Sequence, residues 1–282
     1  MTATTEPRSI YVDAAGFEVH ATAWGATDAP GLVMWHGLAR SGRDFDCIAR
    51  SLADRYHVVC PDTIGRGLSA WSPDPARDYC FETYTKIATS LADQLGFDRL
   101  TWLGTSMGGT IGMRLAAGPL EGRIDRLIVN DIGPTLPEAA VDRIKSYVGN
   151  PPEFDTLTAL EAYFREIYVP FGPHTDAQWR HMAETSFRRL PSGKVTTHYD
   201  PAIVRQFFDH PDDYEIWPAF DALALPLLLL HGADSDLLLP EIIAEMQQRQ
   251  PAMQVEHIEG CGHAPALNTS DQIEIVRQFL VP

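Results

Sequence analysis

Cysteine is scarce in this 282-residue sequence, which contains only four cysteines. Cys47, Cys60, Cys80 and Cys261 are spaced neither like metal ligands nor like a disulfide framework. We therefore expect reduced thiols and an intracellular setting. The ten histidines also include no H-x-x-x-H or H-E-x-x-H pair, so we expect no metal ion and no cofactor.

Long hydrophobic runs are absent as well. Residues 1–9 are polar and include Glu6, which does not fit the apolar segment of a secretory signal. The apolar stretch at residues 223–230 is short and contains Pro226, so it does not predict a membrane span. We expect a cytoplasmic protein without a membrane partner.

Positively charged residues are also few relative to negatively charged ones. The sequence has 22 Lys and Arg against 38 Asp and Glu, a formal net charge of −16. Nucleic acid and anionic membranes would be repelled by such a chain, so we expect neither as a partner. The 45% content of hydrophobic residues is that of a globular protein with a sizeable core, and a small-molecule substrate is the expected partner. The oligomeric state stays open.

Short apolar runs alternate with helix-like segments along most of the chain. Residues 9–13 and 17–24 predict two strands joined by a tight turn. Further strands are predicted at residues 32–35, 57–60, 100–103, 127–129, 227–230 and 255–258. Helices are predicted between them at residues 43–54, 84–95, 110–117, 240–250 and 271–280. This alternation predicts an α/β fold with a mostly parallel sheet.

Residues 132–225 interrupt the alternation. No clean strand is visible there, and helices are predicted at residues 137–147, 158–167 and 175–189. We predict a core formed by residues 1–133 and 226–282, with residues 134–225 inserted as a helical lid. The alternative is a separate domain. The lid is favoured because the strand pattern resumes after the segment and needs the earlier strands to bury it.

The candidate nucleophile is Ser106, in the sequence Gly104-Thr105-Ser106-Met107-Gly108. This G-x-S-x-G pattern follows a predicted strand and precedes a predicted helix. A sharp turn between such elements exposes the serine hydroxyl, and glycines on both sides leave room for the turn. A glycine-rich surface turn is the alternative interpretation.

Other polar residues follow the predicted strands, at the sheet edge where α/β proteins bind ligands. They are His36, Asp62, Asp131, Asp234, Asp236 and His263. With Ser106, they place a serine, an acid and a histidine in the order expected of a hydrolase with such a turn.

These motifs resemble those of the α/β-hydrolase superfamily over nearly the whole chain. His36-Gly37 resembles the oxyanion loop, residues 62–69 resemble the D-x-x-G-x-G-x-S turn, and residues 260–263 resemble the loop of the catalytic histidine. The resemblance implies a mostly parallel eight-stranded sheet with flanking helices and a helical lid after the sixth strand. It also implies that Ser106 is the nucleophile and His263 the base, with an oxyanion hole formed by the amides of Leu38 and Met107.

The catalytic acid departs from the usual pattern of this superfamily. Ser235 occupies the position after the seventh strand where an aspartate is usual. Asp131, directly after the sixth strand, is the preferred acid, because some members take it from that place. Asp236 and Asp234 stay open as alternatives, while Asp62 is expected to brace its own turn.

The segment around Asp131 narrows the resemblance to a bacterial subgroup that includes 2-(acetamidomethylene)succinate hydrolase and related esterases. The implied reaction is cleavage of an ester, amide or related acyl bond through an acyl-enzyme. Carbon–carbon bond hydrolysis of a ring-cleavage diketone and a non-enzymatic ligand receptor on the same fold stay open as alternatives. Among the aromatic residues, Trp35, Tyr168 and Trp179 are the candidates for substrate contact.

Overall fold

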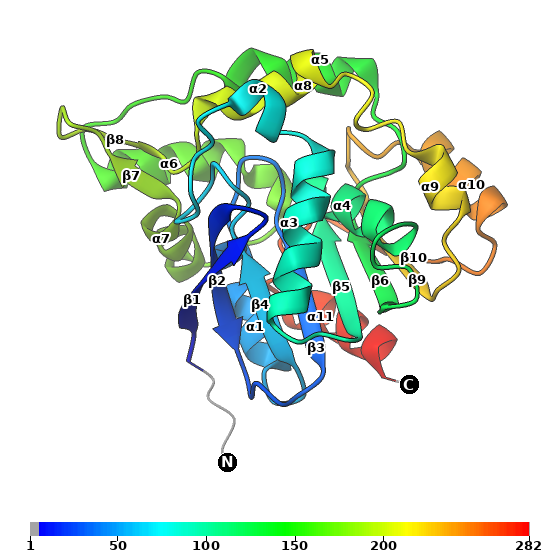
Figure 1. Cartoon of the computed structure of the whole chain (residues 1–282). Coiled ribbons are helices and arrows are strands. Elements are labelled where there is room, and N and C mark those ends of the chain that lie inside the picture. Colours follow the sequence, from blue (N-terminus) through cyan, green and yellow to red (C-terminus); the bar gives the residue numbers. More distant parts are fainter. Residues whose placement is uncertain (1–5, 282) are drawn as a thin grey trace.

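The central sheet contains eight strands in the order β1-β2-β4-β3-β5-β6-β9-β10 (Figure 1). The structure is a computed structural model that describes residues 6–281. The first two pairings, β1 with β2 and β2 with β4, are antiparallel, and the other pairings are parallel. The predicted fold class, a mostly parallel eight-stranded sheet, is therefore confirmed.

The strands of this sheet occupy the predicted runs, with ends that differ by up to three residues. They are β1 Arg8–Ala14, β2 Phe17–Trp24, β3 Gly31–Trp35, β4 His57–Pro61, β5 Leu100–Thr105, β6 Ile124–Asn130, β9 Leu227–Gly232 and β10 Gln254–Ile258.

Helices cover both faces of the sheet, which explains why the inner strands are apolar throughout. In β3, Val33 and Trp35 belong to one hydrophobic core, while Leu32 and Met34 belong to the other. Successive side chains of a strand point to opposite faces, so a sheet covered on both sides needs apolar residues at every position. The first core is covered by α3 (Phe81–Gln94), α4 (Met107–Ala116) and α10 (Pro240–Arg249), and the second by α1 (Asp46–Leu52) and α11 (Ser270–Leu280).

An insertion between β6 and β9 lies above the end of the sheet where β3, β5 and β6 finish (Figure 1). Its elements are α5 Glu138–Val148, α6 Leu157–Ile167, α7 Asp176–Thr185, β7 Phe187–Arg189, β8 Val195–Thr197, α8 Gln206–Asp209 and α9 Trp217–Asp221. Part of the insertion has its own small core, formed by residues such as Leu160, Phe164 and Trp179. The division into core and lid stays a prediction.

The sequence prediction for the insertion was wrong at residues 187–189. The predicted helix at residues 175–189 ends at Thr185, and Phe187–Arg189 pairs antiparallel with Val195–Thr197 as β7 and β8. Strands of three residues are too short to show an alternating pattern, so no periodicity could have indicated them. The short helix α2 (Pro75–Asp78) was not predicted either.

None of the helices within residues 6–281 is both long enough and apolar enough to cross a membrane.

Glycines allow β5, β3 and α4 to approach closely around Ser106. A Cβ atom on Gly104 would lie 2.1 Å from the carbonyl carbon of Gly108, and one on Gly108 would lie 2.0 Å from the carbonyl oxygen of Trp35. Real Cβ atoms do not approach backbone atoms this closely. The glycines on both sides of Ser106 are therefore required by backbone packing, as the sequence predicted.

We expect Gly108→Ala to lower the free energy of unfolding by about 3 kcal/mol, the upper end of overpacking costs, because the added methyl group meets rigid backbone. Urea unfolding measures this change. Gly122→Ala is the control, since Gly122 has a positive φ of 72° but open space around its Cβ position. A Gly108→Ala variant as stable as Gly122→Ala would contradict the packing argument.

Candidate active site

Ser106 lies at the tip of the turn between β5 and α4, in a strained conformation. Its φ is 52° and its ψ is −118°, values that cost a residue with a Cβ atom about 1–3 kcal/mol. The turn is held by hydrogen bonds on both sides. The Ser106 amide donates to the Asn130 carbonyl at 2.9 Å, and the Gly109 amide donates to the Ser106 carbonyl at 2.8 Å. The strain leaves the serine side chain exposed to the cavity described below.

A chain of hydrogen bonds joins Ser106, His263 and Asp131. The distance from Ser106 Oγ to His263 Nε2 is 3.0 Å, and the distance from His263 Nδ1 to Asp131 Oδ2 is 2.8 Å. With the proton on Nδ1, the imidazole donates to the carboxylate, and Nε2 is free to accept the serine proton. This is the arrangement in which a histidine acts as a general base toward a serine.

The Asp131 carboxylate is fully buried and has three hydrogen-bond donors. Oδ1 accepts from the Gly232 amide at 2.8 Å, and Oδ2 accepts from Ser235 Oγ at 2.6 Å as well as from His263. Asp131 itself has a positive φ of 57°. Ser235 occupies the position where an aspartate is usual, and its hydroxyl donates to Asp131 at the end of the sixth strand. Its residue type alone did not indicate this contact.

The two alternative acids have other neighbours. Asp236 forms an ion pair with Arg143, with 3.1 Å between Oδ1 and Nη2, and its side chain is 56% exposed. Asp234 donates its backbone amide to the carbonyl of Cys261. The structure thus brings Asp131, and neither Asp234 nor Asp236, to His263 Nδ1.

Asp62 braces its own turn, as the sequence predicted. Its buried carboxylate accepts from the amides of Gly42 and Leu68 and contacts His20 Nδ1 at 2.8 Å. Burial opposes ionisation, but the hydrogen bonds from His20 and the Leu68 amide prevail and hold the pKa of Asp62 below its usual value.

The expected oxyanion loop passes close to Ser106. A Cβ atom on Gly37 would lie 3.6 Å from Ser106 Cβ. The Gly37 carbonyl accepts from His36 Nδ1 at 2.6 Å and from the Arg40 amide at 3.2 Å. Because a trans peptide unit is planar, fixing this carbonyl also fixes the Leu38 N–H, which points the opposite way.

Met107 provides the second amide expected at the oxyanion. It is the first residue of α4, and the first amides of a helix have no carbonyl partner within the helix. Such an amide is free to donate to a negatively charged oxygen.

His36 is neutral in this structure because of its surroundings. Its Nε2 accepts from the Thr63 amide at 2.9 Å, so Nδ1 carries the proton and donates to the Gly37 carbonyl. Burial lowers the pKa of His36 to about 4.

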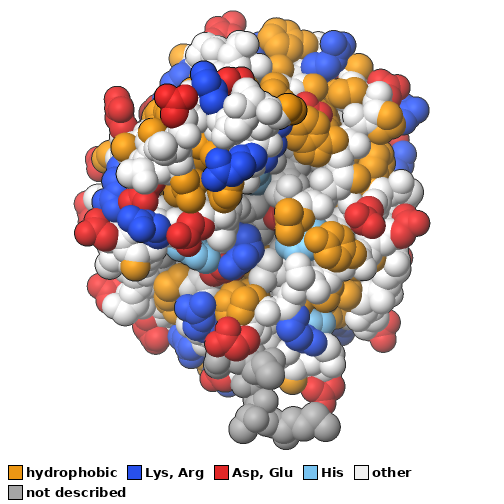
Figure 2. Space-filling model, turned by 90° about the vertical axis from the view of Figure 1, so that its left-hand side faces the viewer, with side chains coloured by type: hydrophobic (Ala, Val, Ile, Leu, Met, Phe, Trp, Pro, Cys, Tyr) orange, Lys and Arg blue, Asp and Glu red, His pale blue; other side chains and the backbone are white. Residues whose placement is uncertain are grey.

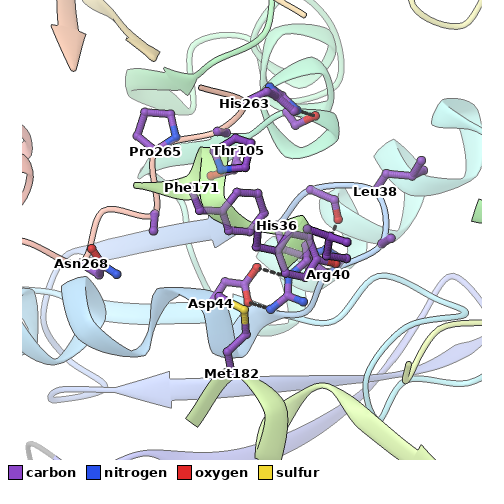
Figure 3. Close-up of a pocket in the computed structure, with 18 of the residues that line it drawn as sticks. His36, Leu38, Arg40, Asp44, Thr105, Phe171, Met182, His263, Pro265 and Asn268 are labelled. Atoms are coloured by element: carbon purple, nitrogen blue, oxygen red, sulfur yellow. Dashed lines mark hydrogen bonds and ion pairs between the residues drawn. The ribbon is translucent and has the colours of Figure 1, made fainter. Parts of the chain in front are cut away.

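A cavity of about 700 Å³ opens beside Ser106 and His263. Its wall combines core residues with residues of the insertion, including Tyr147, Tyr168 and Phe171. The close-up in Figure 3 shows Phe171 and Met182 from the insertion near His36 and Arg40 from the core. Figure 2 views the molecule from the side of α6 and α7, where hydrophobic, basic and histidine side chains surround a hollow.

Of the three aromatic candidates for substrate contact, only Tyr168 lines the cavity. Trp35 is fully buried in the core, where it stacks on Trp102 and donates to Thr63 Oγ1. Trp179 packs into the small core of the insertion. The prediction for Trp35 and Trp179 is therefore corrected, and the reason is that both indoles are needed to fill hydrophobic cores.

The charged residues at positions 40–46, which line the cavity, were not singled out from the sequence. Arg40 pairs with Asp44, and Asp46 pairs with Arg43 and His181. The sequence does show opposite charges spaced i, i+4 and i, i+3 within residues 40–46. Such spacing is common on solvated helix surfaces, so it did not indicate a site. Within residues 6–281, no three His, Cys, Asp or Glu side chains are grouped as a metal site.

Comparisons with known proteins agree with this fold. A family model described as "alpha/beta hydrolase fold" matches residues 30–268. The chain is similar to the 3-hydroxybutyrate-oligomer hydrolase of Cupriavidus necator, with 38% identity over 91% of this chain and 90% of that protein. It is 23% identical to 2-(acetamidomethylene)succinate hydrolase of Mesorhizobium japonicum, over 83% of this chain and 81% of that protein.

A solved structure has the same fold. It is an α/β hydrolase from Novosphingobium aromaticivorans, with a TM-score of 0.86 and 32% identity, covering 98% of this chain and 99% of that one.

We expect the neutral His36 to make stability depend on pH. The unfolded chain binds this proton near pH 6.5, whereas the folded protein binds it near pH 4, so the contribution is complete above pH 6.5 and is lost as the pH falls toward 4. A His36→Gln variant has no such proton. Its deficit in unfolding free energy relative to wild type should shrink by about 2 kcal/mol between pH 7 and pH 5. Urea unfolding at both pH values measures this, and a constant deficit would contradict the prediction.

Proposed function

The chain belongs to the α/β-hydrolase family, and from this premise we propose that it cleaves an ester bond of a small molecule through an acyl-enzyme on Ser106. The hydrogen-bond chain Ser106–His263–Asp131 carries the proposal. Its two distances, 3.0 and 2.8 Å, are those of a nucleophile, a base and an acid that orients the base.

Acylation begins with the attack of Ser106 Oγ on the ester carbonyl carbon, while His263 Nε2 takes the serine proton. The carbonyl oxygen becomes negatively charged and accepts hydrogen bonds from the amides of Leu38 and Met107. One such donor lowers the barrier by about 2.7–4 kcal/mol. His263 then gives its proton to the leaving alkoxide, and the carbon–oxygen bond of the ester breaks.

Deacylation repeats these steps with water. His263 takes a proton from the water molecule, the resulting hydroxide attacks the acyl carbon, and the proton returns to Ser106 Oγ as the acid leaves. Throughout, the buried Asp131 carboxylate keeps the proton of His263 on Nδ1 and stabilises the imidazolium. Asp131 does not itself need to take the proton.

The proposed substrates are short esters of hydroxy acids. The 38% identity to a 3-hydroxybutyrate-oligomer hydrolase, over nine-tenths of both chains, supports this class. The cavity volume of about 700 Å³ is within the range of small-molecule sites, and its wall offers apolar side chains such as Ile144 and Met182 to an aliphatic chain.

We further propose that residues 134–225 act as a lid over this site. Five aromatic and apolar residues of this segment line the cavity: Ile144, Tyr147, Tyr168, Phe171 and Met182. The segment also contacts the histidine loop directly, since the Gly262 amide donates to the Pro170 carbonyl at 2.7 Å. A substrate in the cavity would be enclosed between the insertion and the catalytic residues.

Ser106→Ala should lower kcat on p-nitrophenyl butyrate by at least about 10⁴-fold, because the acyl-enzyme cannot form. The variant should also resist labelling by a fluorophosphonate probe that labels the wild type. A folded Ser106→Ala variant with wild-type turnover would refute the mechanism.

Asp131→Asn should lower kcat on the same ester by about 10⁴-fold, because an amide at this position favours the wrong tautomer of His263. Asp236→Asn is the matched control and should stay within a few-fold of wild type, since Asp236 pairs with Arg143 in the cavity wall and not with His263. Thermal unfolding of both variants excludes misfolding. Collapse of Asp236→Asn together with wild-type activity of Asp131→Asn would reverse the assignment of the acid.

A further inference from the structure

Asn130, the last residue of β6, is a polar residue in the interior of the protein that has no part in the mechanism above. It is fully buried. Its Nδ2 donates to Thr105 Oγ1 at 3.0 Å and to the Pro265 carbonyl at 2.8 Å. Thr105 and Pro265 line the same cavity as His263 (Figure 3). One side-chain amide group thus joins the end of β5 with the loop that carries the histidine.

The two bonds fix the orientation of this amide group. The Pro265 carbonyl can only accept a hydrogen bond, so the nitrogen of the Asn130 side chain, and not its oxygen, must face it. The two N–H bonds of a side-chain amide lie in one plane and diverge at a fixed angle. Thr105 Oγ1 and the Pro265 carbonyl are therefore held in a fixed relation to each other.

The oxygen of the same amide group has a less favourable environment. Within residues 6–281, Asn130 Oδ1 is buried and has no hydrogen-bond partner. An acceptor that is buried without a donor lowers the stability of the fold. Local costs of this kind are typical of residues that serve a functional site. The two bonds of Nδ2 explain the presence of an asparagine here better than stability does.

The loop that carries His263 has few other anchors on the core. In the described part of the chain, the backbone of residues 263–266 takes part in two hydrogen bonds. In one, the Ala266 amide donates to the Phe171 carbonyl of the insertion at 3.1 Å. The other is the bond from Asn130 to Pro265. Asn130 is therefore the residue that anchors this stretch of backbone to the sheet.

We propose that Asn130 is a positioning residue that sets the distance between the Ser106 hydroxyl and the His263 imidazole. Through one rigid group, it holds Thr105, the residue before the nucleophile, and Pro265, two residues after the base. The inference rests on the proposed ester hydrolysis and deepens it.

Asn130 and Asp131 have separate tasks in this arrangement. Asp131 contacts the ring of His263 and orients it, whereas Asn130 fixes the backbone from which the ring projects. Proton transfer needs Ser106 Oγ within hydrogen-bond distance of His263 Nε2, and this distance is 3.0 Å. A displacement of about 1 Å lowers the rate about 10²-fold. Because Asn130 lies outside the cavity wall, its loss should affect this step and not substrate binding.

The first test is Asn130→Leu, which keeps the branched shape of the side chain and removes both donors. On p-nitrophenyl butyrate, kcat should fall about 10²-fold, while KM should stay within about threefold of wild type. A folded variant with wild-type kcat, or with a loss confined to KM, would overturn the proposal.

Gln206→Met is the matched control for the loss of a buried amide. Gln206 is also fully buried, its Nε2 donates to Asp213 Oδ2 at 3.1 Å, and within residues 6–281 its Oε1 has no partner. Gln206 lies outside the cavity wall, so its variant should keep the kcat of wild type even where thermal unfolding shows a lower Tm. An equal loss of kcat in both variants would contradict a specific role of Asn130.

The second test asks whether the effect of Asn130 passes through His263. In a His263→Ala background, the imidazole that Asn130 positions is missing. Asn130→Leu should then change the residual rate, defined as the rate that Ser106→Ala removes, by less than about threefold. A residue that only packs near Ser106 would lower this residual rate as well. A further loss of about 10²-fold in this background would refute the positioning role.

These measurements separate the two proposals. If wild type does not hydrolyse the ester but a fluorophosphonate labels Ser106, the ester hydrolase is refuted, and the rate of labelling replaces kcat in both tests. If Ser106 is not labelled either, both proposals are refuted. If Asn130→Leu does not fold, Asn130→Thr replaces it. A threonine hydroxyl has one donor for two partners, so kcat should fall at least about tenfold, and an unchanged kcat would overturn the proposal.

Discussion

The buried carboxylate of Asp131 connects the segments that form the hydrogen-bond chain to Ser106. It has no exposed surface, yet it accepts from the Gly232 amide, from Ser235 Oγ and from His263 Nδ1. A carboxylate removed from water is stable only when such donors replace the solvent. Three segments that are distant in sequence, the end of β6, the loop after β9 and the histidine loop, are thereby tied to one side chain. Each of them is needed to keep His263 beside Ser106.

The parallel sheet makes this meeting possible. Strands β5, β6 and β9 run side by side and end at the same edge, and the Ser106 and Asp131 amides each donate to a residue near the end of the neighbouring strand. Both residues then turn sharply, with φ values of 52° and 57°. Such strain persists only where the surroundings over-determine it. Around Ser106, the backbone packs so closely at Gly104 and Gly108 that no residue with a Cβ atom fits at either glycine position.

The sequence predicts the parts of the structure that depend on a repeating pattern or on a fixed spacing. The strands can be predicted because both faces of the sheet are covered and the strands are therefore apolar throughout. Ser106 can be recognised because glycines flank it, and His263 because a glycine-rich loop precedes it. The bond from Ser235 to Asp131 joins residues 104 positions apart, and no spacing indicates it. Trp35 and Trp179 were misplaced because an indole suits a core as well as a pocket. The Arg40–Asp44 pair resembles any surface ion pair until the insertion is folded over it.

In the proposed mechanism, substrate specificity depends on the place where the insertion meets the core, because Ser106, His263 and Asp131 alone would treat all activated esters alike. Arg40 comes from the core loop that also carries Leu38, yet its other neighbours, Tyr168 and Ser186, belong to the insertion. Any movement of the insertion therefore moves the contacts that fix the guanidinium. The histidine loop is coupled to the same segment through Gly262 and Pro170. In the proposed lid role, closure of the insertion over a substrate would position both the Arg40 guanidinium in the cavity wall and the histidine loop beside Ser106.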